Sequence, residues 1–285
     1  MNFDWAQAVK AAAIFVFFLG LGIELRHEIT HGSLAKPRQA IVPILAAVGG
    51  MLVPVVIYSI INSGLPSASG WGVPMSTDVA FALAVLGLAG RFMPKSIRVF
   101  LLTVAVVDDS LTILIIALFF ASSFQPLSVF SLAGVALGLF MPRGQAASRW
   151  LNPAANWIAL PTFAAITLWQ TFANFQGQLA GSSITLGVVA AMVFGKPIGV
   201  LGTAWLVTKS GLGKLASDAK WLDLLSIGSL FGICFTVAMM MSELSFGESP
   251  SEHSIANLSV LIGSLTSASL AVIALRIRKR AHVNR

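Results

Sequence analysis

The chain has 285 residues, of which 56% are hydrophobic and 10% charged, with a formal net charge of +7 and a mean hydropathy of +0.87. Soluble domains are less apolar and more highly charged, so this composition excludes an ordinary soluble protein and indicates an integral membrane protein. The basic residues are dispersed among the loops and form no patch with interleaved aromatic residues, which argues against a nucleic-acid-binding protein.

Apolar segments long enough to cross a bilayer as helices follow one another along the chain. Backbone in lipid must satisfy its own hydrogen bonds and no segment alternates like a barrel strand, so we expect helices throughout. The predicted fold is an all-α polytopic membrane protein, a single integral membrane domain over residues 1–285. Its nine predicted spans are 6–28, 40–62, 71–90, 97–121, 126–141, 155–175, 182–208, 222–246 and 254–275.

The loops differ in charge according to the span that they follow. Loops after odd-numbered spans contain lysine and arginine, whereas loops after even-numbered spans contain neither, and the last of these has Glu243, Glu248 and Glu252. Because positively charged loops stay in the cytoplasm, we expect the N-terminus outside and the C-terminus inside the cell.

Two acids lie one helical turn apart at the cytoplasmic end of the first span, Glu24 and Glu28, with His27 between them. A solvated helix end is one interpretation of this group. The alternative is a cluster that senses protons, because histidine changes its charge near physiological pH.

The third and eighth spans contain residues that interrupt helices. Pro74 precedes Asp78 in the third span, and Gly228 and Gly232 lie four residues apart in the eighth. Plain helices, the second with a small-residue packing face, are one interpretation. The alternative is a pair of broken helices, as found at the binding sites of secondary transporters. Asp78 would then offset positive helix N-termini and Lys196 negative helix C-termini.

The fourth span contains two adjacent acids, Asp108 and Asp109, about ten residues beyond Arg98 at the cytoplasmic end. At 1.5 Å per residue they lie about 15 Å deep, where an ionisable side chain is costly and usually functional. Adjacent helical positions differ by about 100° in direction, so one acid can pair with a lysine while the other faces water. Carboxylates that hold either a proton or a small hard cation make the two compete, and the Thr77 hydroxyl would add a further oxygen ligand.

Lys196 lies in the seventh span, with glycines on either side and Pro197 directly after it. A lysine that snorkels to the interface is one interpretation. Long apolar flanks on both sides favour the other, in which Lys196 pairs with an aspartate, most simply Asp108.

Several blocks of the chain resemble, in order, those of the NhaA-type sodium/proton antiporters: GLGIELRHEITHGSLAKPRQA, GWGVPMSTDVAFALAVLGL, AVVDDSLTILIIALFF, GKPIG and GSLFGICFTVAMMMSELSFG. The resemblance implies an inverted-repeat transporter with two interrupted helices in a bacterial inner membrane. It also implies electrogenic exchange of sodium or lithium for a larger number of protons, with no cofactor beyond the transported ions.

The resemblance further implies roles for individual residues. By position it makes Asp109 and Asp108 the paired acids of the ion site, Thr77 and Asp78 part of an unwound helix, Lys196 their partner lysine, and Glu24 and Glu28 part of a pH-responsive region.

The chain also departs from the pattern of that family. We expect it to lack the first helix, two helices between its fourth and fifth spans, and the hairpin that the family uses to dimerise. Phe130 replaces a histidine, Cys234 replaces a glycine, and an acid expected near SRWLNPAANW is missing. These changes concern pH regulation and dimerisation more than ion exchange.

The sequence therefore predicts a sodium or lithium/proton antiporter that exports sodium and regulates internal pH, a transporter and not an enzyme. Two alternatives stay open. A sodium-coupled symporter of a small organic substrate would need a more polar cavity than the sequence offers. A shortened homologue that no longer transports would fit the missing helices, although the membrane acids are intact.

Overall fold

The structure is a computed structural model that describes residues 5–30, 37–115, 126–141, 151, 158–175, 178–247 and 249–283. Over these residues the chain is helical and has no strand, as its composition predicts. The chain divides into two compact units, one formed by residues 1–37 and 110–173 and the other by residues 38–109 and 174–285.

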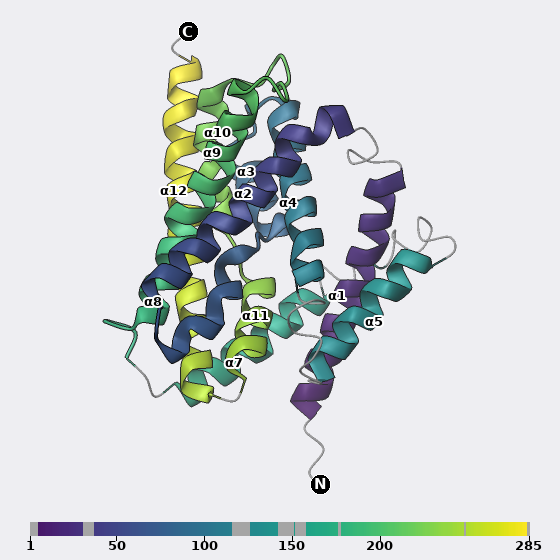
Figure 1. Cartoon of the computed structure of the whole chain (residues 1–285), viewed down its shortest axis with the longest axis vertical. Coiled ribbons are helices and arrows are strands. Elements are labelled where there is room, and N and C mark those ends of the chain that lie inside the picture. The colour runs from purple at the N-terminus through teal and green to yellow at the C-terminus, as the bar shows by residue number, and fades with distance from the viewer. Residues whose placement is uncertain are drawn as a thin grey trace. The chain divides into compact units, whose positions relative to one another are not determined.

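The first unit contains α1 (Trp5–Thr30), α5 (Pro126–Phe140) and α7 (Leu160–Asn174). Helices α1 and α5 pack against each other (Figure 1). A Cβ atom at Gly22 would lie 2.5 Å from the carbonyl oxygen of Val135, so glycine allows the two backbones to approach closely. Arg26 donates a hydrogen bond of 2.9 Å to the carbonyl oxygen of Met141, next to the C-terminal end of α5, where a positive charge is favourable.

The second unit contains the long helix α12, which runs beside several of the other helices of that unit (Figure 1). Its elements are α2 (Pro37–Ile61), η2 (Pro66–Met75), α3 (Val79–Ala89), α4 (Lys95–Ile115), α8 (Ser183–Ala190), η5 (Ala191–Gly195), α9 (Lys196–Lys209), α10 (Trp221–Ile227), η6 (Gly228–Gly232), α11 (Thr236–Phe246) and α12 (Pro250–Val283).

Three unbroken helices in the described residues are long and apolar enough to cross a membrane: Ile41–Ile61, Ser183–Lys209 and Pro250–Ala281. Two further pairs of helices meet the same criteria together but are bent at a short break, which raises the number to five if each pair is one span. The structure therefore supports a polytopic membrane protein, and the count of nine spans stays a prediction.

Large apolar side chains cover the outside of several helices in the second unit. They include Ile60 (70% exposed), Ile198 (59%), Leu206 (59%) and Ile277 (63%). Soluble monomers rarely expose contiguous apolar surface of this kind, whereas lipid would cover it. The polar residues described below lie buried on the inner sides of the same helices.

Candidate functional site

The third and eighth predicted spans are both broken helices. Elements η2 and α3 meet at an angle of 50° across residues 76–78, and η6 and α11 belong to a pair bent by 43° across residues 233–235. The second break follows Gly232 and does not lie between the two glycines that suggested it. Gly232 itself is required by packing, since a Cβ there would lie 2.3 Å from the carbonyl oxygen of Met192.

The two breaks lie against each other and exchange hydrogen bonds. The backbone N–H of Asp78 donates to the carbonyl oxygen of Ile233 at 2.7 Å, and the Thr77 hydroxyl donates to the carbonyl oxygen of Phe231 at 2.8 Å. Ser76 Oγ and Cys234 Sγ lie 2.8 Å apart. Backbone groups that lose their helical partners at a break need others when buried, and here each break supplies them to its neighbour.

Asp78 lies where two helices begin. It is the residue before α3, and its carboxylate accepts hydrogen bonds from the hydroxyl of Thr236 at 2.8 Å and from the backbone N–H of Thr236 at 3.5 Å. Thr236 is the first residue of α11. A negative charge is favourable at a helix N-terminus, so the position of Asp78 fits the counter-charge that the sequence analysis assigns to it.

Asp108 and Lys196 form a buried ion pair. Lys196 Nζ lies 2.7 Å from Asp108 Oδ2, and each side chain is 1% exposed. The side chain and backbone of Thr77 also lie in hydrogen-bonding range of Asp108. The pair thus adjoins the first helix break, and it joins α4 to α9. Removing one partner of such a pair would leave an uncompensated buried charge.

Asp109 follows Asp108 on α4 and is also buried, with 7% of its surface exposed. Its side chain points in a direction about 100° from that of Asp108. The structure therefore places Asp108 and Thr77 together, and Asp109 follows Asp108 on α4. Their role as sodium ligands remains a prediction.

The backbone around Lys196 is shaped by its neighbours in sequence. Residues 191–195 form a wide π-helical turn, closed by a hydrogen bond from the backbone N–H of Lys196 to the carbonyl oxygen of Ala191. Pro197 has no N–H and cannot bond the carbonyl of Val193 as an α-helix requires. Such turns often occur at functional sites, and this one sets the direction of the Lys196 side chain.

Helix α9 also approaches α2 very closely next to Lys196. A Cβ at Gly199 would lie 2.2 Å from the carbonyl oxygen of Gly49, and one at Gly195 would lie 3.0 Å from the Cα of Pro54. Only glycine permits this contact between the two backbones. The glycines that flank Lys196 therefore fix the position of α9 on α2.

The pH-response candidates are described only in part. Glu24 and Glu28 lie on α1, but their side chains, like that of Phe130, fall outside the described residues. The segment SRWLNPAANW also lies mostly outside them.

Sequence reasoning missed two buried polar contacts of the second unit. Ser264 on α12 hydrogen-bonds to the backbone of Cys234 in the second break. Arg278 Nε on α12 lies 2.7 Å from Asp223 Oδ1 at the start of α10. The signal that could have found Ser264 is its place on the inner face of α12, three residues before Ser267 and seven after Asn257, among buried positions at helical spacing.

The chain is similar in sequence to known proteins over most of its length. The family model described as Na+/H+ antiporter 1 matches residues 2–143 and 129–275. The chain is 35% identical to a Na(+)/H(+) antiporter NhaA of Frankia casuarinae over 341 residues, covering 99% of this chain and 77% of the relative. It is 33% identical to that of Thermobifida fusca (95% and 80% covered) and 35% identical to that of Mycolicibacterium smegmatis (94% and 74% covered).

The alignment with the Frankia relative is longer than the 285 residues of this chain. The relative therefore carries residues inside the aligned region that this chain lacks, in agreement with a shortened member.

Proposed function

The chain belongs to the NhaA-type Na+/H+ antiporter family, and from this membership we propose that it exchanges sodium for protons at the buried site formed by Asp108, Asp109 and Thr77. It is a sodium/proton antiporter and not an enzyme. Because antiport moves ions against each other through one site, the site must hold a cation and protons by turns.

The observation that carries this proposal is the ion pair of Asp108 with Lys196 beside two touching helix breaks. A carboxylate buried in the membrane can bind either a proton or a cation such as sodium, which prefers oxygen ligands. Asp109 and Asp108 supply the carboxylates, and Thr77 supplies a hydroxyl. Protons and sodium then exclude each other, which is the basis of exchange.

In this proposal the position of Lys196 depends on whether Asp108 is charged or protonated. When Asp108 is charged, it holds the ammonium group of Lys196 at 2.7 Å. When Asp108 takes up a proton, that attraction is lost and α9 is free to shift relative to α4. The charge of the site is thereby coupled to the conformation of the helices that line it.

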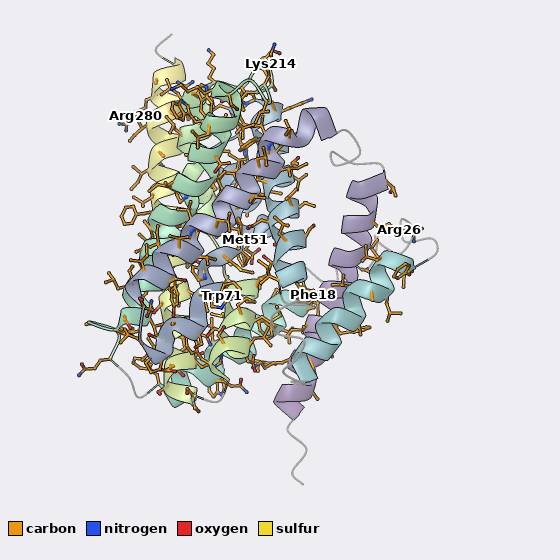
Figure 2. All side chains as sticks on the ribbon, in the orientation of Figure 1. Phe18, Arg26, Met51, Trp71, Lys214 and Arg280 are labelled. Atoms are coloured by element: carbon orange, nitrogen blue, oxygen red, sulfur yellow. The ribbon has the colours of Figure 1, made fainter. Side chains whose placement is uncertain are left out.

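We further infer the architecture and orientation of the family for this chain. The two broken helices fit the crossing pair of an inverted-repeat transporter. In the second unit Lys214 and Arg280 lie at one end and Trp71 lies away from it (Figure 2), and α12 begins near Glu252 and ends near Arg280. By the positive-inside rule the basic end faces the cytoplasmic side of a bacterial inner membrane, and the alternation of loop charges along the sequence puts the N-terminus outside.

Proteoliposomes that contain the purified protein and an internal pH indicator test the proposal. Sodium added outside will enter as protons leave, so the internal pH will rise. Asp109→Asn and Asp108→Asn will abolish the rise, because a neutral amide takes up and releases no proton and brings no negative charge to the cation. Asp218→Asn, which changes an exposed aspartate in the loop before α10, is the matched control and will keep the wild-type response.

The same experiment separates the alternatives. A sodium-coupled symporter would give no pH change without its organic substrate, and a transport-inactive homologue would give none under any condition. An undiminished response in Asp109→Asn would contradict the ion site proposed here.

A further inference from the structure

One side chain of α12, that of Ser264, hydrogen-bonds to the backbone of the second helix break. The hydroxyl of Ser264 donates a hydrogen bond to the carbonyl oxygen of Cys234 and accepts one of 3.3 Å from the backbone N–H of the same residue. Cys234 is the middle residue of the unwound stretch 233–235 and is fully buried, and Ser264 is 7% exposed. A single hydroxyl thus bonds both backbone groups of the residue at the centre of the break.

These two hydrogen bonds replace backbone hydrogen bonds that Cys234 would make in a continuous helix. The unwound residues lie between η6 and α11 and have left the hydrogen-bond ladder of a continuous helix. A buried backbone group without a partner is costly, and Cys234 is fully buried. Ser264 therefore makes the unwound conformation of Cys234 favourable and disfavours its movement away from α12.

Two residues that precede Cys234 in the chain, Phe231 and Ile233, contact the first break at the proposed ion site. The carbonyl oxygen of Phe231 accepts the hydrogen bond of Thr77, and the carbonyl oxygen of Ile233 accepts that of the Asp78 backbone. Cys234 Sγ itself contacts Ser76 Oγ. A shift of Cys234 would move all three contacts, and with them the hydroxyl of Thr77.

We propose that Ser264 is a positioning residue of the antiporter, which fixes the second break against the first and thereby sets the affinity for sodium. This inference rests on the ion site proposed above and adds a residue that touches neither ion. Ser264 acts through Cys234, Phe231 and Thr77, so it changes how well the oxygen ligands are placed and leaves their number unchanged.

The test is the sodium dependence of exchange in proteoliposomes. Ser264→Ala removes both hydrogen bonds, and Ser264→Cys keeps most of the volume but bonds weakly. Both will raise the KM for sodium about fivefold to tenfold, as expected for the loss of one or two hydrogen bonds. Ser264→Thr keeps the hydroxyl and will restore the KM to within about twofold of wild type.

Ser269→Ala is the matched control on the same helix. Its hydroxyl bonds to the carbonyl oxygen of Leu265 within α12 and the residue is exposed, so the KM of the variant will equal that of wild type. If Ser264→Ala does not fold, the Ser264→Cys variant decides. An unchanged KM in the folded Ala and Cys variants, or a loss of maximal rate alone, overturns the proposal.

The Asp109→Asn variant in the same liposomes separates this inference from the proposed function. If that variant still exchanges ions, the ion site is wrong, and the inference about Ser264 falls with it. If it is inactive while the Ser264 variants keep their KM, the ion site stands and only the positioning role is overturned.

Discussion

At the scale of single residues, the stability of the site depends on charges that cancel one another. Asp108 and Lys196 are each 1% exposed and bonded at 2.7 Å. Taking two charges out of water is expensive, and the attraction between them offsets that cost only while both are present. The pair is therefore expected to contribute more to coupling within the site than to net stability.

A double-mutant cycle makes this expectation measurable. Lys196→Met alone leaves the Asp108 charge buried without its partner and is expected to destabilise the protein by about 3–5 kcal/mol. Asp108→Asn combined with Lys196→Met removes both charges and will be closer to wild type than Lys196→Met alone. Unfolding of the purified protein in one detergent gives the free energies.

The cycle also has a clear contrary result. If the double variant is as unstable as the sum of the two single variants, the coupling energy is zero. The contact between Nζ and Oδ2 would then contribute nothing, and Lys196 could not report the charge of Asp108.

At the scale of elements, the contact between α2 and α9 fixes where Lys196 lies. Gly199→Ala would place a Cβ 2.2 Å from the carbonyl oxygen of Gly49, so the backbones must separate. We expect a loss of about 1–3 kcal/mol in the free energy of unfolding, as for other overpacked contacts. The change in unfolding midpoint in detergent measures this loss.

Gly202→Ala on the same helix is the control for this prediction. A Cβ there would meet no described atom within 4 Å, and alanine is the better helix former by up to about 1 kcal/mol. It is expected to be neutral or stabilising. Equal midpoints for Gly199→Ala and Gly202→Ala would show that the close approach of α2 and α9 does not limit stability.

The elements also show what the sequence can predict. Hydropathy places the helices because lipid leaves the backbone few choices, and Pro74 and Gly232 mark the two spans that break. The second break lies at residues 233–235. Its position depends on contacts of Ile233 and Cys234 with residues 76–78, more than 150 residues away in the chain. No local pattern contains such partners. The wide turn before Lys196 depends in part on Pro197, which is visible in the sequence, and in part on packing against α2, which is not.

The candidate site also has residues that the sequence predicts and one that it does not. The membrane acids and Lys196 are visible in the sequence because a charge is rare in an apolar run. Ser264 is not, because serine is common in membrane helices and its hydroxyl can bond its own helix, as that of Ser269 does. In the structure, the two serines differ in burial and in the contact that Ser264 makes with Cys234.

At the scale of the whole molecule, the loop charges predict an orientation that labelling can test. Cys234 is fully buried and gives little background, so an exposed cysteine can be introduced by Lys214→Cys between α9 and α10 or by Ser251→Cys at the start of α12. A membrane-impermeant maleimide is expected to label Ser251→Cys in intact cells and Lys214→Cys only in inside-out vesicles. The reverse pattern would contradict the proposed topology.

With two acids in the proposed site, we expect one sodium ion to be exchanged for two protons. If one sodium ion replaces two protons, each cycle that imports sodium exports one net positive charge. A potential of 100 mV is worth about 2.3 kcal/mol for each charge, which shifts the equilibrium sodium ratio about fiftyfold.

In proteoliposomes, a potassium gradient with valinomycin sets the potential. A negative interior is expected to slow the rise of internal pH after sodium addition, and a positive interior to speed it. A rate that does not respond to the potential would indicate exchange of one proton for one sodium, and then only one of Asp108 and Asp109 would release its proton when sodium binds.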